Sequence, residues 1–412
     1  MGYDPRVQTN PDAMQSHKIA MWSTPRQRAN SRSPVKGQRR LFHEDEDKMH
    51  PKLRASVLVQ VVVLVGCLSV TLLAAAWHGK TSEPASRALR APEPPSTTTV
   101  TPKVAWLMSF PNSGTSFTIH MTREASNCTT ATNYALEGEI KDQPSKPAIP
   151  GEWNGPWLEL IPNRTTTIPS TILTKTHCKG FCSGRSCGPE KTVQTMRSFQ
   201  QGCLSGTRAV QTNQGLEKKT VTYDPTLVSK AIHIFRHPLD NIVARFHLEY
   251  NVETHIKGNS AYAKIFPKDA SGFRRWCAID DQNRQLLETV DARLRERMKD
   301  IPCRNDFFRY VQWHNLAFAT TRAMELPTML LHYHEYEDNF EQARDRVLDW
   351  LELPRVGEGI EFHPGKVYRH YYTDLQKEAI YDFLKEAATA ETWAQIKGYD
   401  FEIGGSSDMT IA

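Results

Sequence analysis

The alternation of apolar and polar positions divides the chain into regions of different kinds. Residues 55–77 carry no charge and consist mainly of Val, Leu and Ala, without the polar face that a buried core helix of this length normally shows. At about 1.5 Å per residue, this run is long enough to cross a bilayer core of about 30 Å, so it predicts a single transmembrane helix. A cleavable signal peptide is disfavoured because residues 1–54 precede the run.

After residue 103 the pattern changes to short apolar runs that alternate with helix-like segments. Strand-like runs occupy 104–110, 171–177 and 231–236, and amphipathic helices are expected at 338–351 and 374–388. This alternation predicts an α/β fold with a parallel sheet flanked by helices. The roughly 300 residues of this region are enough for one large domain.

The composition of the flanking regions predicts the topology. Residues 1–54 are polar and aperiodic, which predicts a disordered tail, and the Pro/Ser/Thr-rich residues 78–102 predict an extended stem; residues 403–412 form a short C-terminal tail. Six lysines and arginines lie in the twenty residues before the apolar run and three in the twenty after it. This bias places the N-terminus in the cytosol and residues 103–402 in the lumen, the type II orientation.

The charge distribution limits the partners. The formal charge of the whole chain is +5, and the tail 1–54 alone carries a surplus of five basic residues. A basic tail beside an anionic membrane surface is the preferred interpretation, and a nucleic-acid partner is not expected. The region from 103 onward is close to neutral, so an intensely polyanionic partner is not indicated.

Small residues form a turn between the first strand-like run and a helix-like segment. Such a turn directs backbone N–H groups toward one point beside the positive end of a helix, which binds phosphate without charged side chains. The lysine of the ATP- and GTP-binding motif is absent, because Thr115 follows Gly114. Hydroxyl donors are expected from Ser113, Thr115 and Ser116. The candidate phosphate-binding residues are Pro111, Asn112, Ser113, Gly114, Thr115 and Ser116.

Polar side chains also follow the other two strand-like runs. Lys175 and His177 end the second, and Arg236 ends the third. Because ligands of open α/β sheets bind beyond the carboxyl ends of strands, we expect these side chains to meet the phosphate loop. A guanidinium in this place suits bidentate phosphate binding. The alternatives are a loop histidine, a solvated lysine and a structural ion pair between Arg236 and Asp240.

These motifs resemble, in the same order, those of the sulfotransferase family, whose members use 3′-phosphoadenosine 5′-phosphosulfate (PAPS). Residues 109–116 look like the family's 5′-phosphosulfate loop, usually written YPKSGTT. Residues 175–177 are similar to its KTH motif, and 236–241 to its RxPxD segment. Weaker similarities extend the resemblance over 103–402; they lie at 330–338, 368–372 and 398–401.

The resemblance implies a sulfotransferase fold, with a P-loop-like parallel sheet, and roles for single residues. His177 is the expected general base, Lys175 the expected charge-stabilising cation and Arg236 the expected 3′-phosphate ligand; Arg369 is a candidate second contact, with a surface turn as its alternative. The implied reaction transfers a sulfuryl group to a hydroxyl or amine of a glycan or another lumenal acceptor, without a metal ion. With the predicted membrane span, it implies a Golgi-type enzyme.

Two departures from the family pattern keep other functions open. Asn112 stands where the family has a lysine, and Ala244 stands where it has a serine. A non-catalytic protein that binds a nucleotide or a glycan is therefore an alternative. A phosphate-transferring P-loop enzyme is a third class, which the missing lysine disfavours.

Eight cysteines are expected to reflect the lumenal environment. Cys67 lies in the predicted membrane span. Disulfides are favoured over a zinc site in the cluster of Cys178, Cys182, Cys187 and Cys203, because the spacing lacks paired CxxC motifs. A bridge between Cys277 and Cys303 is one of the pairings that the sequence leaves open; with it, Cys128 is free or links two chains as a disulfide-linked dimer. N-glycosylation patterns occur at Asn127 and Asn163.

Overall fold

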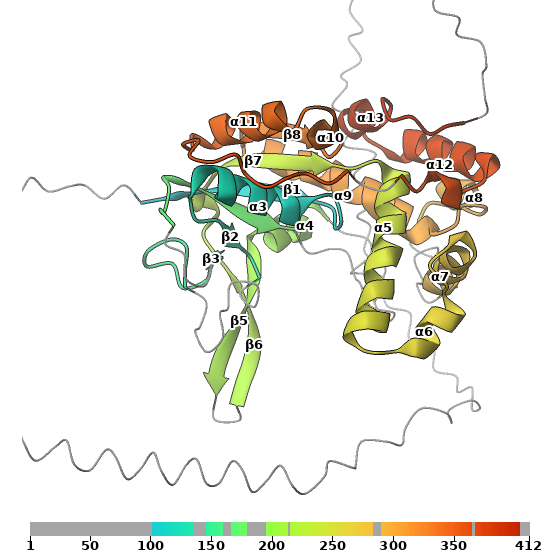
Figure 1. Ribbon diagram of the computed structural model, residues 1–412, viewed down its shortest axis with the longest axis horizontal. Coiled ribbons are helices and arrows are strands. Elements are labelled where there is room, and N and C mark those ends of the chain that lie inside the picture. Colours follow the sequence, from blue (N-terminus) through green and yellow to red (C-terminus); the bar gives the residue numbers. More distant parts are fainter. Residues whose placement is uncertain are drawn as a thin grey trace, which may run out of the picture. The chain divides into compact units, whose positions relative to one another are not determined.

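The computed structural model describes residues 101–134, 146–159, 166–178, 195–212, 215–282, 290–364 and 367–403 (Figure 1). The predicted cytosolic tail and membrane span lie outside these residues, as do nearly all of the stem and of the C-terminal tail. Among the described residues, no helix is both long and apolar enough to cross a bilayer.

Six strands form one sheet in the order β3-β2-β4-β1-β7-β8. The central strand β1 pairs in parallel with β4 and β7, and β8 and β2 continue the parallel arrangement on either side. The edge strand β3 is antiparallel to β2. The strands are β1 (Lys103–Ser109), β2 (Ala131–Thr132), β3 (Trp157–Leu158), β4 (Thr171–Thr176), β7 (Val228–Phe235) and β8 (Thr328–His332). The predicted α/β fold with a mostly parallel sheet is confirmed, and all three predicted strands are present.

The apolar residues of β1 serve two separate cores. Val104, Trp106 and Met108 belong to one buried cluster, whereas Ala105 and Leu107 belong to the other. Successive side chains of a strand point to opposite faces, so a strand covered on both faces must be apolar without interruption. The continuous apolar run at 104–108 is explained by this position in the middle of the sheet.

Helices cover both faces of the sheet. Residues of α3 and α11 belong to one core cluster, and residues of α5, α9 and α12 belong to the other. The α-helices are α3 (Thr115–Ser126), α4 (Met196–Leu204), α5 (Pro238–Asn251), α6 (Ser260–Ile265), α7 (Ala270–Gln282), α8 (Ala292–Arg297), α9 (Arg304–Ala323), α10 (Glu335–Asp338), α11 (Phe340–Leu351), α12 (Asp374–Ala387) and α13 (Ala390–Ile396). Shorter helical turns are η4 (Pro225–Leu227), the π-helical η5 (Val252–Ile256) and η7 (Arg369–Tyr371).

The two helices expected from amphipathic periodicity are found with small changes. The expected helix 338–351 begins later, at Phe340, because Asn339 is the N-cap and its side chain accepts a hydrogen bond from the N–H of Gln342. The expected helix 374–388 is α12, which Thr373 caps and which ends one residue earlier than predicted.

Within the described residues, two disulfides join elements beside the sheet. Cys178, just after β4, is bonded to Cys203 in α4, and Cys277 in α7 is bonded to Cys303, the residue before α9. The second is a pairing that the sequence left open, and the first places a disulfide in the predicted cluster, whose other two cysteines lie outside the described residues. Cys128 is a buried free thiol. An antiparallel hairpin that was not predicted, β5 (Ser205–Thr212) with β6 (Gly215–Thr222), follows Cys203 and projects from the sheet (Figure 1).

Candidate active site

The loop between β1 and α3 depends on two residues with left-handed backbone conformations. Asn112 has a φ of 66° and Gly114 a φ of 101°. A Cβ atom at Gly114 would lie 2.5 Å from Cδ2 of Tyr333, so glycine is required here. α3 begins directly afterwards and has no side-chain cap at its N-terminus. Its first N–H groups and the positive end of its dipole thus border the loop, as an anion site requires.

The loop is held from behind by α5. Nδ2 of Asn241 lies 3.0 Å from the carbonyl oxygen of Pro111 and 3.0 Å from the hydroxyl of Ser113, and donates to both. Ser113 is fully buried, whereas Ser116 is exposed. Ser113 therefore helps to hold the loop in place, rather than presenting its hydroxyl to a ligand as the sequence suggested.

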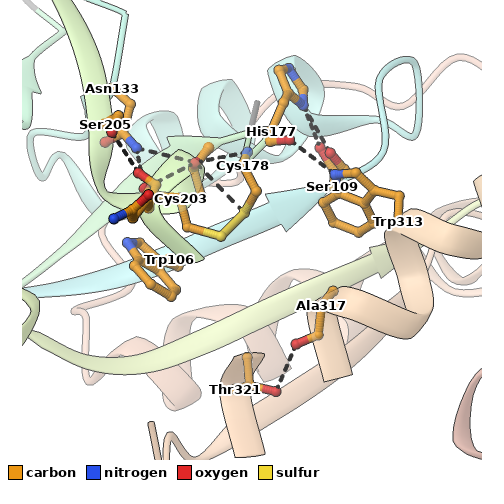
Figure 2. The surroundings of a disulfide bond; sticks show 12 residues. Trp106, Ser109, Asn133, His177, Cys178, Cys203, Ser205, Trp313, Ala317 and Thr321 are labelled. Carbon is orange, nitrogen blue, oxygen red and sulfur yellow. Dashed lines mark hydrogen bonds between the residues drawn. A yellow bond between two sulfur atoms is a disulfide. The ribbon is translucent and has the colours of Figure 1, made fainter. Parts of the chain in front are cut away.

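The His177 ring faces the end of β1 (Figure 2). Its Nδ1 lies 2.9 Å from the carbonyl oxygen of Ser109 and 3.2 Å from the Ser109 hydroxyl. Because a carbonyl oxygen only accepts hydrogen bonds, Nδ1 carries the proton of the neutral ring, and Nε2 carries the lone pair. This tautomer allows Nε2 to act as a general base.

Tyr134 contacts both residues predicted to be catalytic. Its hydroxyl accepts a hydrogen bond of 3.0 Å from the N–H of His177, and the two rings stack with centroids 5.8 Å apart. Nζ of Lys175 lies 5.8 Å from the centroid of the Tyr134 ring. Tyr134 thus helps to fix the positions of the imidazole and the ammonium group relative to each other.

Arg236 stands at the carboxyl end of β7 and reaches the phosphate loop. Its Nη1 donates a hydrogen bond of 2.8 Å to the carbonyl oxygen of Asn112, and its guanidinium lies over the Tyr333 ring, 4.7 Å from the centroid. The alternative ion pair with Asp240 does not form between these two described residues. Instead, Asp240 accepts a hydrogen bond of 2.7 Å from the N–H of Tyr368.

Helix α9 holds the backbone of both His177 and Arg236. Nε1 of Trp313 donates a hydrogen bond of 2.9 Å to the carbonyl oxygen of His177 (Figure 2), and Oη of Tyr310 donates one of 2.7 Å to the carbonyl oxygen of Arg236. Both aromatic side chains are buried. The sequence carries no local signal for either residue, because their partners are far away along the chain.

One cavity of about 1000 Å³ brings together all of the predicted residues except Ser113 and Arg369. It lies at the carboxyl ends of the neighbouring strands β4, β1 and β7, as expected for an open α/β sheet. No group of three or more His, Cys, Asp or Glu side chains suited to a metal ion occurs in the described part of the chain. The predicted residues that line the cavity are Pro111, Asn112, Gly114, Thr115, Ser116, Lys175, His177 and Arg236.

Arg369 lines a second, smaller cavity of about 240 Å³, to which Arg236 and Tyr333 also contribute. Its Nη1 lies 3.0 Å from a carboxylate oxygen of Glu402 and 3.6 Å from one of Asp400. The predicted role of Arg369 in binding the same phosphate as Arg236 places that phosphate beside the second cavity, which both residues line.

The comparisons with known proteins do not name a family for this chain. No model of a known protein family matches it, and no curated protein matches its sequence.

Proposed function

We propose that this protein is a PAPS-dependent sulfotransferase that transfers a sulfuryl group to a hydroxyl or amine of a glycan or another lumenal acceptor. The observation that carries the proposal is the single cavity lined by the phosphate loop, His177 and Arg236. This arrangement favours the binding of a nucleotide that carries anionic groups at both its 5′ and 3′ positions. The loop is suited to the first group, and the guanidinium of Arg236 to the second.

In the proposed reaction the acceptor oxygen forms a bond to sulfur while the bond between sulfur and the bridging phosphate oxygen breaks. Adenosine 3′,5′-bisphosphate leaves, and Nε2 of His177 takes the acceptor proton. Lys175 and the N–H groups of the loop stabilise the charge that develops on the leaving phosphate. Because the protein forms no covalent bond, positioning and electrostatics supply the rate enhancement.

Asn112 fits this scheme as a backbone element. Its carbonyl oxygen accepts the hydrogen bond from Arg236, and its positive φ shapes the loop. Its amide side chain brings no charge, so the cations that remain at this end of the cavity are Lys175, Arg236 and the neighbouring Arg245. The scheme therefore assigns to Lys175 the role of the lysine that the family has in its loop.

A protein that binds the nucleotide without transferring sulfate is the second candidate. Two observations favour it: Asn112 carries no positive charge, and Ala244 lines the cavity without the hydroxyl that the family serine would supply. The His177 tautomer favours catalysis instead, because donor binding alone does not require a lone pair on Nε2.

The proposed location is the Golgi membrane, in the single-pass type II orientation, with the sheet domain in the lumen. The disulfides Cys178–Cys203 and Cys277–Cys303 support an oxidising compartment. The membrane anchor is inferred from the apolar run 55–77 of the sequence.

Transfer of [³⁵S]sulfate from labelled PAPS to a panel of glycans tests the proposal, with full-length protein purified in detergent. We expect His177→Ala to lower turnover by about 100-fold or more, the range of general-base catalysis, while adenosine 3′,5′-bisphosphate still binds. His363→Ala is the matched control, because His363 is 82% exposed and lines neither cavity. Nucleotide binding without transfer by the wild type would favour the second candidate, and equal turnover of wild type and His177→Ala would exclude His177 as the base.

A further inference from the structure

The cavity extends from the phosphate loop along one face of α5. Arg245, Glu249, Glu253 and Lys257 follow one another at intervals of four residues, and all of them line the cavity. Residues at this spacing share one face of a helix, and α5 continues directly into η5. α5 extends away from the sheet toward α6 and α7 (Figure 1). The wall of the cavity far from the loop is thus formed by α5 and η5, and a π-helical turn of this kind is frequent at functional sites.

Positive charge is concentrated at the sheet end of the cavity. Lys175 and Arg236 stand at strand ends, and the guanidinium of Arg245 lies 5.3 Å from the centroid of the Phe110 ring, beside the loop. Arg245 is also paired with the buried Asp306 at 3.1 Å. A nucleotide with a phosphosulfate and a 3′-phosphate brings several negative charges to this end. The negative charges of the donor therefore balance the positive side chains near the loop. No unbalanced positive charge remains there to attract an acidic acceptor.

The far part of the cavity carries the opposite charge. Nζ of Lys257 lies 2.7 Å from a carboxylate oxygen of Glu253, so these two charges compensate each other. Oε1 of Glu249 accepts a hydrogen bond of 3.1 Å from the hydroxyl of Tyr262. Within the described residues, no lysine or arginine lies within ion-pair distance of Glu249. The space left for the acceptor is therefore bordered by an uncompensated carboxylate.

We infer that the acceptor is an uncharged, hydroxyl-rich molecule such as a neutral glycan, and that Glu249 binds its hydroxyl groups. The inference rests on the proposed sulfotransferase function. A carboxylate accepts hydrogen bonds from sugar hydroxyls, whereas Glu249 would repel the carboxylate or sulfate of an acidic glycan. Leu248 and Trp276 line the same cavity and offer apolar surface to the C–H faces of a sugar ring.

Matched neutral and acidic acceptors test this inference with [³⁵S]PAPS and the full-length protein. The neutral members are lacto-N-tetraose and chitohexaose; the acidic members are sialylated lacto-N-tetraose and a hyaluronan hexasaccharide. We expect sulfate to enter the neutral members at least about tenfold faster, because like charges in a shared site are strongly disfavoured. Faster or equal transfer to the acidic members, or no transfer to the neutral members, would overturn the inference.

Two isosteric variants distinguish the effect of losing the Glu249 carboxylate from the effect of losing an acidic residue elsewhere on the protein. Glu249→Gln should lower kcat/KM for the neutral acceptors about tenfold and reduce the preference for them over the acidic ones, with adenosine 3′,5′-bisphosphate binding unchanged. Glu378→Gln is the control, because Glu378 is exposed on α12 and lines neither cavity. Equal behaviour of the two variants would contradict a role of Glu249 in acceptor choice.

Calorimetric titration with adenosine 3′,5′-bisphosphate distinguishes a failure of this inference from a failure of the proposed function. Nucleotide binding with preferential transfer to acidic glycans would leave the sulfotransferase proposal standing and refute the neutral acceptor. Absence of nucleotide binding would refute both.

Discussion

Replacement of Arg236 by glutamine tests the assignment of the 3′-phosphate site. The guanidinium makes two contacts in the structure, one with the carbonyl oxygen of Asn112 and one with the face of Tyr333. Neither contact uses both edges of the guanidinium, so it can also bind a phosphate. A hydrogen bond to a charged group contributes about 1.5–3 kcal/mol, which corresponds to a loss of affinity of about 10- to 100-fold.

The assay is isothermal titration of wild type and Arg236→Gln with two nucleotides, adenosine 3′,5′-bisphosphate and AMP. AMP lacks the 3′-phosphate, so we expect the variant to weaken binding of the bisphosphate by about 10- to 100-fold and binding of AMP by less than about threefold. Arg295→Gln is the control, because Arg295 is exposed on α8 and lines neither cavity.

An equal loss of affinity for both nucleotides would exclude Arg236 as the ligand of the 3′-phosphate. It would mean that Arg236 acts by supporting the loop through the carbonyl oxygen of Asn112, and that the 3′-phosphate, if it is bound at all, lies elsewhere. Equal affinity of the wild type for both nucleotides would show that the 3′-phosphate contributes nothing to binding, which would also contradict the assignment of Arg236.

Three further variants test other parts of the site. Gly114→Ala should lower the free energy of unfolding in urea by about 1–2 kcal/mol and abolish nucleotide binding, because the φ of 101° at Gly114 and the nearby Tyr333 ring exclude a Cβ atom. Unchanged nucleotide binding would contradict the assignment of this loop as the phosphate site. Trp313→Phe should lower kcat several-fold without changing nucleotide affinity, because it removes the hydrogen bond that positions the His177 backbone; an equal loss of nucleotide affinity would indicate a general structural role. Burial lowers the pKa of His237 from 6.5 to about 4. Between these two pH values the unfolded chain therefore binds more protons than the folded protein. The free energy of unfolding that His237 contributes above pH 6.5 is lost as the pH falls, by about 3 kcal/mol near pH 4. His237→Asn should make urea unfolding less sensitive to pH over this interval, and an unchanged pH dependence would contradict that cause.

The sheet and the phosphate loop could be predicted because their signals are local. The apolar run of β1 and the small residues after it are contiguous, and the carboxyl ends of neighbouring parallel strands meet at one edge of a sheet. The same rule predicted that Lys175, His177 and Arg236 lie close together, and all three line one cavity. The polar residues at strand ends were therefore the most informative part of the sequence.

The contacts that orient the site could not be predicted. Trp313 reaches His177 across 136 positions of sequence, and it belongs to a helix with buried residues on all sides, so no amphipathic pattern singles it out. The burial of Ser113 depends on Asn241, a partner from another helix. The charges at intervals of four residues along α5 and η5 are visible in the sequence, but only the cavity shows that this face borders a candidate ligand site.

A crystal structure of the protein with adenosine 3′,5′-bisphosphate would show directly whether the phosphate loop and Arg236 bind one nucleotide. We expect the 5′-phosphate to contact the N–H groups of Asn112–Ser116, the 3′-phosphate to contact Arg236, and His177 to border the space beyond the 5′-phosphate. A nucleotide bound on another face, or bound with its phosphates away from both the loop and Arg236, would contradict this expectation.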